Sequence, residues 1–196
     1  PKKKVEVIEK VAPHTIKKCE LIEHYVDEWA RKILGFNGMN GRDGSKGIIY
    51  IDCMSNSGLY YDSDDNLVDG TALRVAKRLN DILPKYPDKM GYVMFNDISQ
   101  EKIDRLKKEL DGLKLSNITV RFNCGDGNEF IKELDIKELQ KQCGTLLLYD
   151  PYQAAIDWDA ITPYLNTWGE VIINHMVSDT NRGASQATRE KAIQKY

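Results

Sequence analysis

The sequence has few of the residues that bind metal ions or build disulfide scaffolds. Its 196 residues include four cysteines and three histidines. The cysteines are far apart and form no CxxC pair, and no HExxH motif occurs. This spacing argues against a zinc ribbon, a disulfide-stapled domain and a metal site built from a local motif. We therefore expect no metal ion. Because no signal-peptide pattern opens the chain, we expect a protein of the reducing cytoplasm.

Long apolar runs and an excess of charge of one sign are absent as well. The longest apolar runs, residues 47–51 and 145–149, have the length of a buried strand and are too short to span a membrane. The formal net charge is −2, so no overall field draws the chain to nucleic acid or to an anionic membrane. A composition of 41% hydrophobic and 30% charged residues is that of a globular protein, and the length allows one domain.

The sequence does contain an alternation of helical and strand-like segments. Apolar residues recur every three or four positions over residues 15–34, which predicts a helix with Thr15 as its N-cap and Gly35 at its end. A polar, glycine-rich loop follows over residues 37–45. Beyond it we predict strands at 47–53, 91–96, 118–123, 144–149 and 169–175, and helices at 70–83, 98–110, 128–134 and 156–165.

This alternation predicts an α/β domain with a parallel sheet. Short continuous apolar strands are typical of sheets covered on both faces, and strand–helix–strand units connect parallel strands. We expect residues 1–35 to form a helical cap on a core of residues 36–196. Residues 186–196 have the pattern of a sixth crossover helix that no strand follows. We therefore expect the C-terminal strands of the sheet to be missing and the chain to be a fragment of a longer protein.

Acidic residues lie at or just after the ends of four consecutive predicted strands, namely Asp52, Asp97, Asp126 and Asp150. Open parallel sheets bind ligands at the carboxyl ends of their strands. After the second strand, Asp97 precedes Ile98, and a carboxylate there suits the two hydroxyls of a ribose. One strand further along, Asp126 and Gly127 lie where an adenine amino group would fall. Each aspartate could instead be only the N-cap of the next helix.

The segment after the first strand consists of small residues. Ser55, Asn56 and Gly58 would let backbone N–H groups approach a ligand closely. The GxGxxG fingerprint of dinucleotide sites is absent, and so is a P-loop. Four acids at four strand ends fit an adenosine with an amino-acid tail better than a pyrophosphate. S-adenosylmethionine is a ligand of this kind.

Several segments together resemble the three-Cys-motif partner proteins (TcmP family), a bacterial group of methyltransferase-like proteins. Residues 51–60 are similar to that family's IDxFAGPGxY strand and loop, and residues 70–73 to its GSPL-type helix start. Residues 14–18, with Tyr25 and Trp29, resemble its opening helix, and residues 171–182 its closing strand. The segment Asp150-Pro151-Tyr152 resembles its DPYG element. The resemblance covers nearly all of the chain.

The resemblance implies a class I, Rossmann-like methyltransferase fold, a three-layer sandwich with a mostly parallel sheet, and S-adenosylmethionine as cofactor. We assign cofactor binding to the residues at the first three strand ends, which are Asp52, Ser55, Asn56, Gly58, Asp97, Ile98, Asp126 and Gly127. Asn56 and Ser57 stand where the family has glycine and proline, and Met54 where it has phenylalanine. Asparagine tolerates a left-handed backbone, so the turn can survive this change.

We assign catalysis to Asp150, Pro151 and Tyr152. These residues also resemble a shortened (D/N/S)PP(Y/F) element of amino-group methyltransferases. That element implies that the carboxylate and a proline carbonyl accept hydrogen bonds from an exocyclic amine while the aromatic ring stacks on the base. A nucleic-acid base is therefore a candidate substrate. We expect Asp150 and the loop of residues 55–58 to line one pocket, with Asp97 on its far wall.

Two functions remain open. The first is an active S-adenosylmethionine-dependent methyltransferase, which the acids at the strand ends favour. The second is a methyltransferase-like module without turnover, which the altered glycine loop favours. By the same resemblance, this module would bind a protein with a three-cysteine motif that looks like a radical S-adenosylmethionine enzyme.

Overall fold

The centre of the molecule is a five-stranded sheet. The computed structural model describes residues 7–150, 156–166 and 168–174. In this part of the chain the sheet consists of β4 (Gly47–Asp52), β7 (Met90–Asp97), β8 (Ile118–Cys124), β9 (Cys143–Tyr149) and β10 (Gly169–Ile173). All neighbouring strands of this sheet pair in parallel. The five predicted strands and the parallel α/β class are confirmed.

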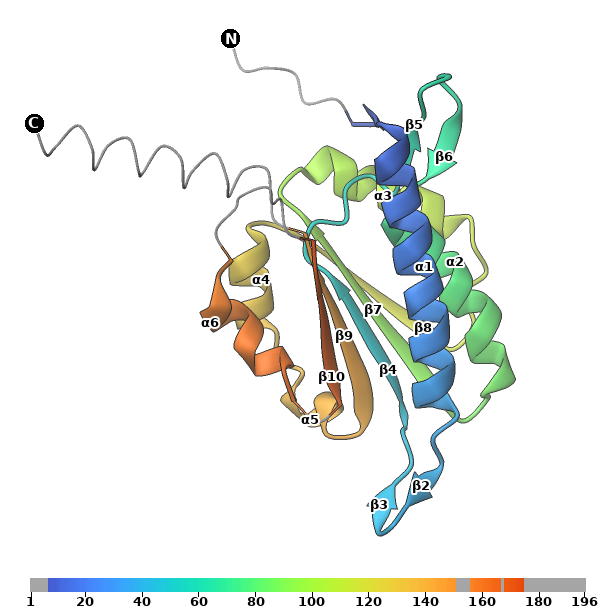
Figure 1. Ribbon diagram of the computed structural model, residues 1–196, viewed down its shortest axis with the longest axis vertical. Coiled ribbons are helices and arrows are strands. Elements are labelled where there is room, and N and C mark those ends of the chain that lie inside the picture. The colour runs from blue at the N-terminus through green and yellow to red at the C-terminus, as the bar shows by residue number, and fades with distance from the viewer. Residues whose placement is uncertain (1–6, 151–155, 167, 175–196) are drawn as a thin grey trace, which may run out of the picture.

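The order of the strands makes the sheet Rossmann-like. Across the sheet the order is β10-β9-β4-β7-β8, so the first of the five strands lies in the middle (Figure 1). The second and third follow on one side and the fourth and fifth on the other, which is the arrangement of doubly wound sheets. The direction of winding reverses between β4 and β9, which pair from Gly47 with Cys143 to Asp52 with Leu148. The carboxyl ends of these two neighbouring strands mark the topological switch point of the fold.

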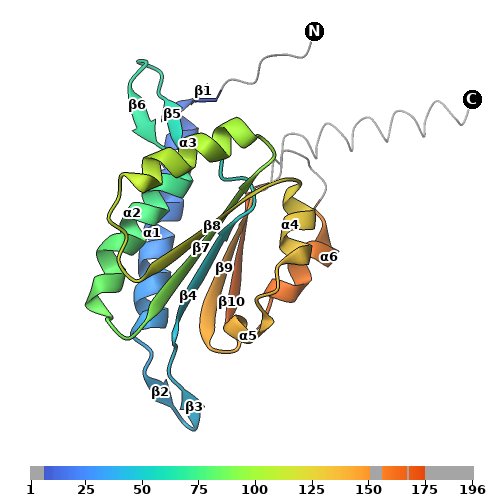
Figure 2. The same cartoon turned by 180° about the vertical axis from the view of Figure 1, so that it is seen from behind.

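Helices cover the two faces of the sheet and make three layers (Figures 1 and 2). One face carries α1 (Pro13–Leu34), α2 (Thr71–Ile82) and α3 (Gln100–Asp111), and the other carries α4 (Gly127–Glu133), α5 (Lys137–Gln140) and α6 (Trp158–Ile161). Ile48 and Tyr50 pack in the core under α1–α3, and Ile49 and Ile51 in the core under α4 and α6. Successive strand residues point to opposite faces, so the apolar run of β4 serves both cores.

The strand β8 differs from the expectation that both faces of every strand are covered. It is an edge strand, and its residues alternate between half-buried and exposed. Ile118, Val120 and Phe122 pack against the core under α1–α3. Thr119, Arg121 and Asn123 on the opposite face are exposed. Alternation of this kind is typical of a strand with one solvated face, and residues 118–123 alternate between apolar and polar side chains in the same way.

Several helix ends differ from the predicted ones. The N-cap of α1 is Ala12 and not Thr15, because Pro13 occupies the first helical position, where its missing N–H is not needed. The helix α3 begins at Gln100 and not at Ile98, because the Ser99 side chain accepts the N–H of Lys102 as an N-cap. The predicted helix 156–165 is α6 followed by the 3-10 turn η2 (Thr162–Tyr164). Another 3-10 turn, η1 (Leu83–Lys85), follows α2.

Two hairpins and a short N-terminal strand were not predicted. The loop after α1 forms a hairpin of β2 (Gly38–Met39) and β3 (Arg42–Asp43). Its turn residues Asn40 and Gly41 have φ of 53° and 77°, the left-handed conformation that two-residue hairpin turns need. After β4 comes a second hairpin, β5 (Leu59–Tyr61) with β6 (Leu67–Asp69), and β1 (Glu9–Lys10) pairs in parallel with β5. This pairing brings the N-terminal segment to the carboxyl edge of the main sheet.

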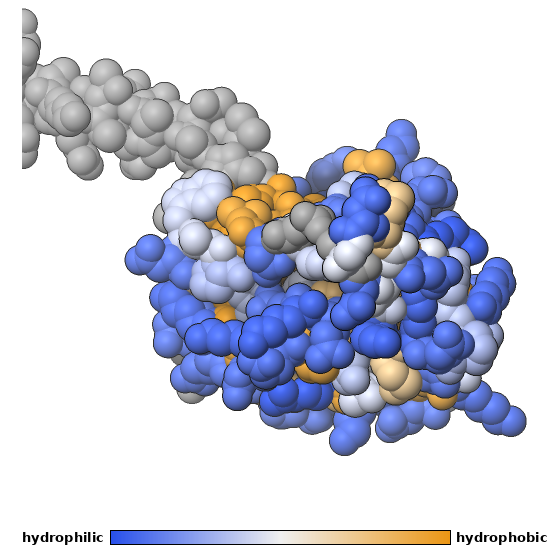
Figure 3. Space-filling view, turned by 90° about the horizontal axis from the view of Figure 1, so that it is seen from below, coloured by the Kyte–Doolittle hydropathy of each residue, from blue (hydrophilic) through white to orange (hydrophobic). Residues whose placement is uncertain are grey.

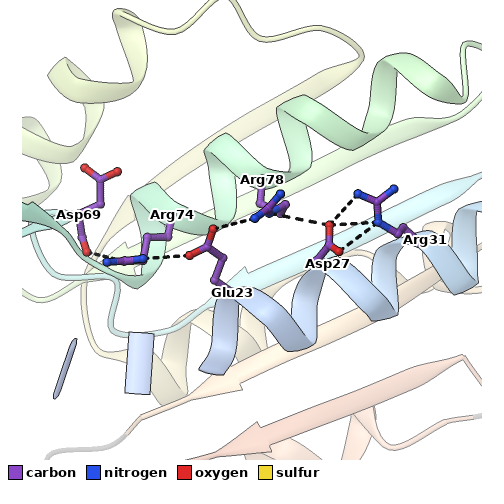
Figure 4. A network of polar contacts seen from close by, with 6 residues as sticks. All are labelled: Glu23, Asp27, Arg31, Asp69, Arg74 and Arg78. Carbon is purple, nitrogen blue, oxygen red and sulfur yellow. Dashed lines mark hydrogen bonds and ion pairs between the residues drawn. The ribbon is translucent and has the colours of Figure 1, made fainter. Parts of the chain in front are cut away.

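The helices α1 and α2 are joined by a row of ion pairs (Figure 4). Glu23 contacts Arg74 at 3.0 Å and Arg78 at 3.4 Å. Asp27 pairs with Arg31 at 3.0 Å within α1, and Arg78 Nε lies 3.8 Å from the same carboxylate. The buried side of α1 contributes to the core of its face of the sheet. The first helix is thus fixed by apolar contacts beneath and by charges along its flank.

The end of the molecule that carries β2 and β3 is seen from below in Figure 3. Hydrophilic side chains cover most of this face, and apolar ones form separate patches. None of the helices in the described ranges has both the length and the apolar character of a membrane span.

Candidate functional site

The loop after β4, residues 53–58, turns sharply at the carboxyl edge of the sheet. Asn56 and Gly58 adopt left-handed backbone conformations, with φ of 56° and 74°. The expectation that asparagine preserves this turn is confirmed. A Cβ atom on Gly58 would lie 2.5 Å from Cδ1 of Leu106 in α3, so a larger residue there would be strained in conformation and would also displace Leu106.

Polar groups of β7 hold this loop from the neighbouring strand. The N–H of Asn56 donates to Oδ2 of Asp97 at 3.0 Å, and the N–H of Ser55 donates to the carbonyl of Asn96 at 2.7 Å. The N–H of Ser57 donates to the side chain of Asn56 at 2.6 Å. The sequence led us to expect these N–H groups to face a ligand. The structure differs, because each of the three has a partner within the protein.

Two of the predicted site acids, Asp52 and Asp97, are buried beneath the loop with 1% and 3% of their surface exposed. Asp97 also accepts the N–H of Ser99 on Oδ1 at 2.9 Å, so both of its oxygens bind backbone groups. Asp52 accepts the N–H of Met54 at 3.1 Å. The pKa of Asp52 is raised to about 7, mainly by burial. The N–H of Met54 lowers it, and the charges of Asp150 and Asp97 contribute to raising it.

A cavity of about 390 Å³ lies at the switch point of the sheet. Its walls come from the loop after β4, the ends of β9 and β10, the hairpin β5–β6, and α1 with the segment before it. The lining residues are Glu9, Val11, His14, Thr15, Lys18, Met54, Asn56, Tyr60, Asp150 and Asn174. The expectation that Asp150 and the first-strand loop share one pocket is confirmed. Asp97 lies under Asn56 rather than on the far wall.

Asp150 is about one quarter exposed on the wall of this cavity. Its Oδ2 accepts a hydrogen bond from Nζ of Lys18 at 2.7 Å, and its Oδ1 accepts one from Nδ2 of Asn174 at 2.5 Å. The sequence led us to expect that this carboxylate accepts hydrogen bonds from a substrate amine. The structure instead places a cation and an amide against the carboxylate, so the wall is electrically balanced. The other two predicted catalytic residues, Pro151 and Tyr152, lie outside the described residues.

The remaining predicted residues lie at the ends of β7 and β8. Ile98 is 76% exposed beside the buried Asp97. Asp126 is exposed and is the N-cap of α4, because its Oδ1 accepts the N–H groups of Asn128 at 2.9 Å and Glu129 at 3.1 Å. Gly127 is buried, and a Cβ atom there would lie 3.1 Å from the carbonyl oxygen of Cys53. Glycine thus lets the loops after β8 and β4 approach each other.

Sequence reasoning did not assign Lys18, His14 or Asn174 to the site. Lys18 and Asp150 are 132 positions apart in the chain, and a lysine on a helix carries no local signal of such a contact. Among the described residues no group of three or more His, Cys, Asp and Glu side chains could hold a metal ion. Cys19, Cys53, Cys124 and Cys143 are free thiols.

Comparison with known proteins gives the following. No family model and no curated protein matches the sequence. Among solved structures, an rRNA methylase from Streptococcus thermophilus aligns over 78% of this chain and 69% of its own, with 12% identity and a TM-score of 0.41. A Listeria monocytogenes protein assigned to the class I S-adenosylmethionine-dependent methyltransferases aligns over 74% of this chain and 35% of its own, with 12% identity and a TM-score of 0.40. This chain thus spans about a third of the second protein's length. It is the strand order of the chain itself that makes the fold α/β and Rossmann-like.

Proposed function

We propose that this chain binds S-adenosylmethionine at the carboxyl edge of its sheet and transfers the methyl group to an acceptor. One observation carries the proposal: Asn56 after β4 and Asp150 after β9 line one cavity at the switch point of the sheet. Rossmann-like sheets bind their ligands at this junction. The cavity volume of about 390 Å³ lies within the range of small-molecule sites, roughly 300–1,000 Å³.

The residues around the carboxyl edge fit the parts of this cofactor. Ile98 is exposed and apolar, and Asp126 is exposed at the next strand end, so this side suits a flat base with polar edges. The switch-point cavity suits the amino-acid tail, which would lie beside Asn56, and the sulfonium. When bound, the cofactor supplies a methyl group activated by the positive sulfur.

We propose an amine as the methyl acceptor, of the kind found on a nucleic-acid base. Asp150 supports this choice, because its two oxygens already accept N–H groups from Lys18 and Asn174 within the cavity. An acceptor amine would take the place of one of these donors. The carboxylate would then orient the amine toward the methyl group, which is catalysis by proximity and orientation.

One observation favours the second function, a module without turnover that binds a three-Cys-motif partner protein. Both oxygens of Asp97 hold backbone N–H groups, and Asp150 forms an ion pair with Lys18. A site in which the acids already have partners inside the protein is stable without a ligand. In that case the loop after β4 would serve the fold alone.

A calorimetric titration with S-adenosylmethionine and with its demethylated product S-adenosylhomocysteine separates the two functions. The methyltransferase should bind both compounds, and label from the methyl group should appear on RNA or DNA oligonucleotides. Asp150→Asn should keep binding of S-adenosylhomocysteine within about threefold and lose methyl transfer, whereas the exposed Asp159→Asn should change neither. The absence of binding by the wild type at millimolar ligand would rule out the methyltransferase and leave the module.

A further inference from the structure

Asn96 is a buried amide in an otherwise apolar part of β7. It is 1% exposed, and the residues before it, Val93, Met94 and Phe95, are all buried and apolar. Burying an amide costs free energy unless all of its polar groups find partners. A leucine of similar size would fill the same space without that cost. Apolar packing alone therefore gives no reason for an asparagine at this position, and the reason must lie in the partners of its amide.

The amide of Asn96 contacts both neighbouring strand ends. Its Nδ2 donates to the carbonyl of Cys53 at 2.9 Å and to the carbonyl of Gly125 at 3.0 Å. Its Oδ1 accepts from Nδ2 of Asn123 at 2.7 Å. Both N–H bonds and the carbonyl of the side chain are thus used. Cys53 belongs to the loop after β4, and Gly125 to the loop after β8.

The backbone of Asn96 and Asp97 also binds the loops after β4 and β8. Its carbonyl accepts the N–H of Ser55 at 2.7 Å and the hydroxyl of the same serine at 3.1 Å. The carbonyl of Asp97 accepts the N–H of Gly125 at 3.1 Å. Because β7 lies between β4 and β8 in the sheet, this end of the strand sets the spacing of the two loops. A network in which every member is satisfied holds its parts in one arrangement.

We propose that Asn96 is a positioning residue that aligns the loop after β4 with the loop after β8, so that one elongated ligand can use both. The inference rests on the proposed function for the identity of that ligand. The adenosine part would lie toward Ile98 and Asp126, and the amino-acid part in the cavity beside Asn56. Fixing the two subsites before binding removes the entropy cost of aligning them in the complex.

The test compares a ligand that spans both loops with one that reaches a single loop. Calorimetry with Asn96→Leu should show an affinity for S-adenosylhomocysteine about tenfold lower than in the wild type, while the affinity for adenosine changes less than twofold. The loss arises because the variant has to align the two loops when the spanning ligand binds, whereas adenosine uses only one of them. Equal affinity for S-adenosylhomocysteine in both proteins overturns the proposal. An equal loss for both ligands also overturns it, because that result indicates general damage to the fold.

The matched control is Asn80→Ala. Asn80 also joins two backbone groups through its amide: it donates to the carbonyl of Lys114 at 3.2 Å and accepts from the N–H of Ser116 at 2.9 Å. The loop that Asn80 holds is away from the carboxyl edge of the sheet. Asn80→Ala should leave the affinities for S-adenosylhomocysteine and for adenosine unchanged. If Asn96→Leu does not fold, as judged by circular dichroism, Asn123→Ala replaces it. Asn123→Ala removes one of the three hydrogen bonds of the Asn96 side chain and should lower the affinity for S-adenosylhomocysteine about threefold. An unchanged affinity in this variant would contradict the proposal.

Amide hydrogen exchange tests the positioning without any ligand. In Asn96→Leu the exchange of the Ser55 and Gly125 amides should rise together at least tenfold, whereas Asn80→Ala should raise exchange only around Ser116. If the wild type binds neither compound, the proposed function fails, and the exchange result alone decides the role of Asn96. Unchanged exchange at Ser55 and Gly125 would then refute it.

Discussion

At the scale of single residues, two glycines with the same backbone conformation differ in their surroundings. Gly58 in the loop after β4 has φ of 74°, and Gly41 in the β2–β3 turn has φ of 77°. A Cβ atom at Gly41 would have no neighbour within 4 Å, whereas at Gly58 it would lie 2.5 Å from Leu106 Cδ1. The pair separates the cost of the left-handed conformation from the cost of crowding.

Gly58→Ala should therefore lower the free energy of unfolding more than Gly41→Ala. The left-handed conformation costs each alanine about 1–2 kcal/mol. Gly58→Ala also displaces the buried Leu106, and overpacking of this kind costs a further 1–3 kcal/mol or so. Urea unfolding of both variants and the wild type measures the difference. Equal losses would mean that Leu106 moves aside without cost.

Asp52 is a buried carboxyl group whose charge changes near neutral pH. Its folded-state pKa of about 7 lies above the value of about 3.9 for an unfolded aspartate. Folding thus favours the protonated form. The stability that this form contributes is fully present below pH 4 or so and is lost as the pH rises through about 7.

Asp52→Asn cannot ionise, and its amide oxygen can still accept the N–H of Met54. We expect the difference in free energy of unfolding between Asp52→Asn and the wild type to shift in favour of the variant between pH 4 and pH 8, by on the order of a few kcal/mol. Urea unfolding at a series of pH values measures this gap. The exposed Asp81→Asn is the control and should show no such gain. Parallel stability curves for Asp52→Asn and the wild type would contradict the raised pKa.

At the scale of secondary-structure elements, the contact between α1 and α2 combines an apolar side with a charged one. Glu23 is the centre of the charged side, because it contacts Arg74 and Arg78 of the neighbouring helix. Its side chain is 22% exposed, so solvent screens these pairs only in part. The fixed position of α1 matters for the site, since Lys18 on this helix reaches Asp150.

Glu23→Gln should lower the free energy of unfolding by about 1 kcal/mol, because each partly exposed pair contributes a few tenths to 1 kcal/mol. Glu20→Gln, an exposed change of the same kind on the same helix, should cost less than half of that. Urea unfolding at low salt measures both, and the cost of Glu23→Gln should shrink in 1 M salt. A cost that does not respond to salt would assign the effect to packing.

At the scale of the whole molecule, ligand binding is linked to stability. A ligand that binds only the folded chain stabilises it by about 2.7 kcal/mol at a concentration of 100 times its Kd. For a chain of this size the melting temperature should rise by about 5–10 °C. Differential scanning fluorimetry with S-adenosylhomocysteine measures the shift, and ATP is the control ligand. No shift at millimolar S-adenosylhomocysteine would argue against the proposed site. An equal shift with ATP would argue against recognition of the amino-acid tail.

The sequence by itself determined the class of the fold and the place of the candidate site. The runs at 47–51 and 145–149 are apolar without interruption, and this pattern arises when both faces of a strand are covered. Asp52, Asp97, Asp126 and Asp150 follow strands that run in the same direction, so they had to meet at one edge of the sheet. The hairpins at 38–43 and 59–69 escaped prediction, because strands of two or three residues are too short to show a periodicity.

Only the tertiary structure decided which partner each site residue has. The contacts of Lys18 and Asn174 with Asp150, and of Asp97 with Asn56, join segments that are far apart in the chain. No local pattern encodes such pairs, because they depend on the order of the strands and on the path of α1. No local pattern gives the partners of Asn96 either, because in the sequence it is only a polar residue next to Asp97. Burial between two loops makes its amide groups need partners, and the sheet supplies them from both sides.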